Sequence, residues 1–179
     1  MHEQPTVSPE ARNRKHVAFL YAKTTEDTFC TIVTRRPHAA SPHASEELHR
    51  IADHLPTEKC VSASSSGAAS LHAILKGLEY VTANANALDI GVVHVFTDIR
   101  HLLSAWNNHD YWEASGTFLK RDGDVVKEEP SWRVILETHR KLPVNVVFGT
   151  ANGRDQSAIM MRLAKDAAIR VRDTREVAA

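Results

Sequence analysis

The stretch IGVVHVFTD at residues 90–98 is the most informative part of the chain for the fold. It is an apolar run of the length of one strand, and it ends in Thr97-Asp98. Strands that are buried on both faces of a sheet have continuous apolar runs of this kind. We therefore expect a buried strand whose carboxyl end presents the carboxylate of Asp98.

Apolar periodicity outward from this strand predicts a meander of strands followed by alternating helices and strands. This order predicts an α/β domain built on a five-stranded mixed β-sheet with helices on both faces. The predicted strands are residues 17–22, 28–34, 59–62, 90–97 and 144–148. The predicted helices are residues 45–55, 68–81, 99–106, 130–141 and 155–171.

The composition is that of an ordinary folded domain, with 42% hydrophobic and 25% charged residues. We expect a flexible tail at residues 1–15, one domain at 16–172 and a short tail at 173–179. No apolar run approaches the roughly 20 residues that a membrane span needs. Two cysteines are too few for a disulfide scaffold, and the first residues are polar, so we expect a cytoplasmic protein with reduced thiols.

The net charge is zero, from 22 basic and 22 acidic side chains. Non-specific affinity for nucleic acids comes mostly from the neutralisation of phosphates by Lys and Arg. The chain has no global excess of positive charge for that purpose. Electrostatics therefore gives no positive argument for nucleic-acid binding, although local basic patches remain open.

The order of elements resembles the ribonuclease H family over residues 17–171, and several motifs support the resemblance. Thr97-Asp98 matches an acid that the family places at the end of a strand. The predicted helix at 45–55 departs from the family pattern. Residues 70–79 resemble the first family helix. The handle region and the helix start after it are matched by Trp112, the loop at 116–125 and Pro130-Ser131-Trp132. The last helix is matched by Leu163-Ala164-Lys165.

The resemblance implies an enzyme that hydrolyses the RNA of RNA–DNA hybrids with two divalent metal ions. Two cations about 4 Å apart need several carboxylates that converge on one crevice. The family supplies four acids and a histidine, and only one of these five groups is retained here. Carried over position by position, the family groups fall on Ala22, Ser70, Asp98, Thr150 and Met161.

A single carboxylate cannot offset two adjacent dications, so we expect a catalytically inactive domain with no metal cofactor. The alternative is a metal-dependent nuclease with relocated acids, which would use Mg²⁺ or Mn²⁺. In that case Asp27 and Asp155, with Glu26 nearby, would join Asp98. As turn residues, Glu26 and Asp27 also have an ordinary structural explanation.

Several side chains are candidates for contact with nucleic acid, and each has a purely structural alternative. Ser65 and Ser66 stand where the family reads the hybrid, but serines also suit a helix entrance. Trp106 and Trp112 suit either base stacking or internal packing. The last group is the basic pair on the closing helix, Arg162 and Lys165, which suits phosphate contact or a solvated face.

The leading hypothesis is therefore an inactive ribonuclease H-like domain that binds protein, RNA or an RNA–DNA hybrid. The first alternative is the nuclease with relocated acids. The second is a structural or self-associating protein, a homo-oligomer with no nucleic-acid role. No membrane partner is expected.

Overall fold

The computed structural model describes residues 13–38, 44–59, 66–120, 122–142, 144–151 and 156–178. The strands are β1 (His16–Thr24), β2 (Thr28–Pro37), β3 (Glu46–His54), β4 (Ile90–Phe96) and β5 (Asn145–Gly149). The helices are α2 (Ser66–Asn84), α3 (Arg100–Asn107), α4 (His109–Ser115), α5 (Glu129–Lys141) and α6 (Gln156–Ala178), with a 3-10 turn η2 (Thr57–Lys59).

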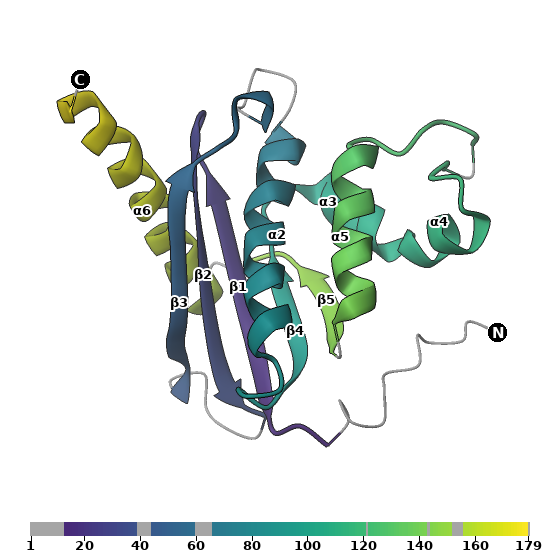
Figure 1. Ribbon diagram of the computed structural model, residues 1–179, viewed down its shortest axis with the longest axis horizontal. Helices are drawn as coiled ribbons and strands as arrows, with labels where there is room; N and C mark the ends of the chain where they lie inside the picture. Colours follow the sequence, from purple (N-terminus) through teal and green to yellow (C-terminus); the bar gives the residue numbers. More distant parts are fainter. Residues whose placement is uncertain are drawn as a thin grey trace.

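The strands form one mixed sheet in the order β3-β2-β1-β4-β5. The first three strands are an antiparallel meander, and β4 and β5 are parallel to β1. Helices α2 and α5 lie on one face of the sheet, and α6 lies on the other (Figure 1). The prediction of a five-stranded mixed sheet with helices on both faces is confirmed.

The central strand β1 is buried on both faces, as its apolar run predicts. Ala18 and Leu20 belong to the core under α2, whereas Phe19 and Tyr21 belong to the core under α6. Side chains of a strand alternate between the two faces, so one apolar run supplies both cores.

Helix α6 approaches the sheet closely because its inner face is made of small residues. Ala164 and Ala168 are fully buried against the aromatic side chains of β1. The hydroxyl group of Thr28 on β2 donates a 2.6 Å hydrogen bond to the carbonyl of Ala168. A buried hydroxyl and a helix carbonyl therefore satisfy each other at this contact.

The predicted helix at residues 45–55 is wrong, because residues 46–54 form the edge strand β3. Val33 of β2 pairs with His49 and Thr34 pairs with Glu47, so the register skips Leu48. Such a bulge breaks the period of two. The apolar residues that pack on the core, Leu48 and Ile51, consequently lie three apart, as they would on a helix. The inserted helix that the sequence predicted is therefore absent from the described residues 46–54.

The predicted strand at 59–62 is wrong at Lys59, which is the last residue of the 3-10 turn η2. The rest of that prediction lies outside the described residues. The predicted tail at 173–179 is wrong up to Ala178, because α6 continues to that residue. Its last turns contain Arg, Glu and Ala, which favour helix, and neither Gly nor Pro.

At the other end, residues 1–12 of the predicted 1–15 tail lie outside the described part. Residues 14 and 15 are held on the domain. The Arg14 guanidinium donates a hydrogen bond of 2.9 Å to the carbonyl of Ile90, and the Lys15 amide donates one of 3.1 Å to the Asp89 carboxylate.

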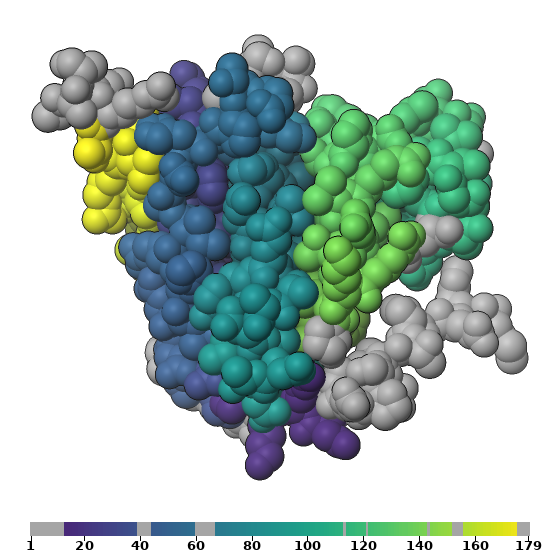
Figure 2. Space-filling model, viewed as in Figure 1, coloured from purple at the N-terminus to yellow at the C-terminus, as the bar shows by residue number. Residues whose placement is uncertain are grey.

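The segment from α3 to residue 128 projects beside α5 (Figure 2). Three tryptophans attach it to the sheet. Trp106 stacks on Phe148 of β5 at 4.8 Å between ring centroids, and Trp112 meets Trp132 of α5 at 5.7 Å. Helix α4, which is not among the predicted helices, follows Asn108 and ends at Gly116, which is in the left-handed conformation.

No helix in the described ranges combines the length and apolar character that a membrane crossing needs.

Candidate functional site

The candidate site lies where the parallel strands β1, β4 and β5 end together. Tyr21 of β1 pairs with Phe96 of β4, so Ala22 and Thr97 follow at the same edge. The amide of Thr97 donates a 3.1 Å hydrogen bond to the carbonyl of Gly149, which brings the end of β5 alongside. The carboxyl ends of parallel strands are where α/β folds usually place their ligands.

Asp98 is the one family acid at this edge, and it has a basic partner. The ammonium group of Lys23, the residue after Ala22 on β1, donates a hydrogen bond to the Asp98 carboxylate. The Asp98 side chain is 57% exposed and that of Lys23 is 22% exposed. A lysine cation therefore occupies the side of Asp98 that faces β1.

The other family positions present no carboxylate. Ala22, Ser70 and Met161 are each buried, with 4–6% of the residue exposed. Thr150 follows β5 directly and is exposed. Met161 packs in the core under α6 rather than facing the strand ends.

The described residues do not fit a two-metal centre. Two dications need several carboxylates, whereas this edge offers Asp98, which is already paired with a cation. In the described part of the chain, no three His, Cys, Asp or Glu side chains lie close enough together to hold one metal ion. Asp98, Glu26 and Asp27 therefore form no displaced cluster by themselves, and Asp155 lies outside the described residues.

The two tryptophans proposed for base stacking are internal. Trp106 is 4% exposed and Trp112 is 3% exposed, and their rings pack on neighbouring aromatic side chains. A ring must present an open face to stack on a base. The structure supports the packing alternative for both residues.

The remaining candidates have different outcomes. Ser65 lies outside the described residues, and Ser66 is the first residue of α2, a position that suits the helix-entrance alternative. Arg162 and Lys165 are exposed on α6 and remain available for contact with an anionic partner. Their role stays a prediction.

Lys23 is the site residue that the sequence analysis missed. A parallel pairing of the first and fourth predicted strands would have placed Lys23, the residue after Ala22, next to Asp98. The two residues are 75 positions apart, so no local spacing reveals the pair. Only the register of two strands that are not adjacent in sequence brings them together.

No protein family model matches the chain, and no curated protein matches its sequence. Among solved structures, the foamy viral protease-reverse transcriptase in complex with dsDNA has a TM-score of 0.59 at 12% identity, over 94% of this chain and 97% of that one.

Two ribonuclease H domains are also similar. The RNase H domain of prototype foamy virus has a TM-score of 0.58 at 15% identity, over 88% of this chain and 94% of that one. LC11-RNase H1 in complex with an RNA/DNA hybrid has a TM-score of 0.52 at 13% identity, over 87% and 98%. Likeness at these identities concerns the fold. The chain therefore has the ribonuclease H-like fold.

Proposed function

We propose that this chain is a catalytically inactive ribonuclease H-like domain that binds nucleic acid without cutting it. The observation that carries the proposal is the pairing of Asp98 with Lys23 at the strand ends. A two-metal enzyme needs several carboxylates that converge at the strand ends. In this chain, the Asp98 carboxylate at the strand ends is paired with the Lys23 ammonium group.

The charge at this edge supports the inactive assignment. Lys23 places a positive charge next to Asp98, and a metal ion bound there would be repelled by it. The other family positions are apolar or hydroxyl side chains: Ala22, Ser70 and Met161 are buried, and Thr150 is exposed. Neither type of group neutralises a dication as a carboxylate does.

The nucleic-acid part of the proposal is supported by the fold and by local charge. Structures with the same fold are described in complex with dsDNA and with an RNA/DNA hybrid. On this chain, α6 carries the exposed Arg162 and Lys165 next to Met161. Lysine and arginine contacts to phosphates give affinity without base readout, so binding should be insensitive to sequence.

A fluorescently labelled RNA–DNA hybrid tests both parts in one preparation of the full chain. With Mg²⁺ or Mn²⁺ we expect intact hybrid on a denaturing gel. By fluorescence anisotropy we expect binding that weakens steeply between about 50 mM and about 200 mM salt. Arg162→Ala with Lys165→Ala should weaken binding, whereas Lys141→Ala, which removes one cation of α5 that is 68% exposed, serves as a control.

Metal-dependent cleavage that disappears in Asp98→Ala would overturn the inactive assignment. Absence of binding to hybrid, duplex and single-stranded RNA at low salt would overturn the nucleic-acid assignment.

A second candidate function is binding to protein, which a specific surface feature favours. Ile159 and Leu163 of α6 are 58% and 37% exposed and lie four residues apart, so they share one face of the helix. Exposed apolar side chains in a cluster mark interaction sites more often than isolated ones do. Sedimentation velocity across a range of concentrations, with Ile159→Glu as the comparison, tests self-association through this face.

A further inference from the structure

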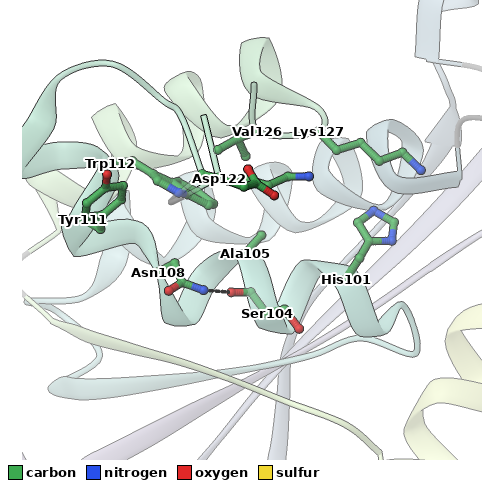
Figure 3. A pocket seen from close by; sticks show the side chains of 10 residues that line it. His101, Ser104, Ala105, Asn108, Tyr111, Trp112, Asp122, Val126 and Lys127 are labelled. Carbon is green, nitrogen blue, oxygen red and sulfur yellow. Dashed lines mark hydrogen bonds between the residues drawn. The ribbon is translucent and has the colours of Figure 1, made fainter. Parts of the chain in front are cut away.

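A pocket of about 500 Å³ opens in the projecting segment between α3, α4 and the turn at residues 118–126 (Figure 3). Pockets that bind small molecules typically measure about 300–1,000 Å³ and have mostly apolar walls with a few polar groups. This pocket is of that size and its lining is largely apolar.

The interior of the pocket is apolar and already formed. Ala105 points into it from α3, and Trp112 and Val126 line it (Figure 3). Trp112 and Val126 are only 3–4% exposed, so they are packed in place before any ligand arrives. A preformed apolar surface binds without the cost of ordering it.

Backbone hydrogen bonds hold the wall opposite α3. The amide of Val126 donates a hydrogen bond of 2.9 Å to the carbonyl of Phe118, and the amide of Lys120 donates one of 2.8 Å to the carbonyl of Asp124. Phe118 has a φ of 51°, and the Arg133 guanidinium lies 4.1 Å from its ring centroid. A bulky residue keeps a positive φ only where its surroundings hold it, so this wall is a built turn.

Among the lining residues that the structure describes, two lysines stand against one carboxylate. Lys120 and Lys127 are exposed, and neither ammonium group has an ion-pair partner in the part of the chain that the structure describes. Asp122 is the one acidic lining residue, and its carboxylate accepts a 3.1 Å hydrogen bond from the amide of Asp124. Burial and the charge of Lys127 lower the pKa of His101, which therefore stays neutral at pH 7.

We propose that this pocket binds a small organic anion, with an apolar body against Ala105, Trp112 and Val126 and a carboxylate, sulfonate or phosphate toward Lys120 and Lys127. An apolar interior selects the body, and the ammonium groups of Lys120 and Lys127 select an anionic group. The proposal goes beyond nucleic-acid binding and does not depend on it.

The probe is 8-anilinonaphthalene-1-sulfonate, which has an aromatic body and one sulfonate. Its neutral analogue N-phenyl-1-naphthylamine lacks the sulfonate and separates the contribution of charge from that of apolar contact. We expect the full chain to bind the anionic dye more tightly. Combined Lys120→Ala and Lys127→Ala should weaken the affinity for the anionic dye by roughly three- to tenfold, as the loss of two exposed charge pairs implies. The affinity for the neutral dye should not change.

A second variant tests the cavity itself. Ser104 is exposed and lines the pocket from α3, so Ser104→Tyr should fill the cavity and weaken both dyes, whereas Ser104→Ala should not. Lys141→Ala, outside the pocket, is the control for general loss of charge. If Ser104→Tyr fails to fold by circular dichroism, the two lysine substitutions still decide the matter.

Equal loss of both dyes in the double lysine variant would overturn the proposal. Unchanged binding in folded Ser104→Tyr would place the dye elsewhere and overturn it as well. Displacement of the anionic dye by a single-stranded oligonucleotide would assign the pocket to a nucleic-acid surface and overturn the small-anion assignment.

Discussion

Replacing Gly77 by alanine tests how closely α2 approaches the sheet. Gly77 lies within α2, and a Cβ added to it would stand 2.5–2.7 Å from side-chain carbons of Leu20 on β1. Carbon atoms in contact prefer about 3.5–4.0 Å. Leu20 is fully buried in the core, so its side chain has no open space into which to move.

The magnitude follows from two opposing effects. Overpacking a filled core costs about 1–3 kcal/mol of unfolding free energy. Alanine within a helix is better than glycine by about 1 kcal/mol. Gly77→Ala should therefore destabilise the chain by about 0–2 kcal/mol. In a Leu20→Ala background the clash is absent, and the same substitution should stabilise the chain by about 1 kcal/mol.

Urea unfolding of the four chains, followed by far-ultraviolet circular dichroism, measures this cycle. Leu20→Ala alone should cost about 2–5 kcal/mol, because it leaves a cavity. We expect the effect of Gly77→Ala to become more favourable by at least about 1 kcal/mol when Leu20 is truncated. An equal stabilisation in both backgrounds would show that α2 does not approach β1 this closely.

Three further predictions concern single side chains. Burial and the positive charges of Arg36 and His38 lower the pKa of His94 in the folded chain below 6.5. Below about pH 6.5 the unfolded chain therefore binds more protons than the folded chain, and the free energy of unfolding falls as the pH falls. His94→Phe should reduce this loss in urea unfolding at about pH 5.5 compared with about pH 7.5, and an unchanged loss would contradict it. Lys23→Ala should cost less than about 1 kcal/mol, because Asp98 is largely exposed, and a cost that persists in high salt would argue against a surface pair. Burial raises the pKa of the Cys30 thiol to about 11, so in a Cys60→Ser background Ellman's reagent at about pH 8 should label only the unfolded chain, whereas rapid native labelling would contradict the buried position.

Much of the fold could be predicted because its signals are local. The apolar runs at β1 and β4 and the spacing of Leu71, Leu75 and Leu78 on α2 follow directly from burial on a strand or along one helix face. The third strand could not be predicted in this way. The bulge at Leu48 depends on pairing with β2, and local spacing alone resembles a helix.

The candidate site was predicted in part for the same reason. Asp98 was found because the end of an apolar strand is visible in the sequence. Its partner Lys23 depends on the parallel register of β1 and β4, which local patterns do not contain. The internal position of Trp106 and Trp112 likewise depends on contacts with Trp132 and Phe148, which come from later parts of the chain.

Calorimetric titration of the full chain with Mn²⁺, repeated with Asp98→Asn, most directly tests the scarcity of carboxylates at the strand ends. We predict no saturable heat beyond dilution in either protein, because Lys23 already neutralises Asp98, the one family acid that is retained there. Binding of two manganese ions per chain, lost when Asp98 is replaced, would contradict the account.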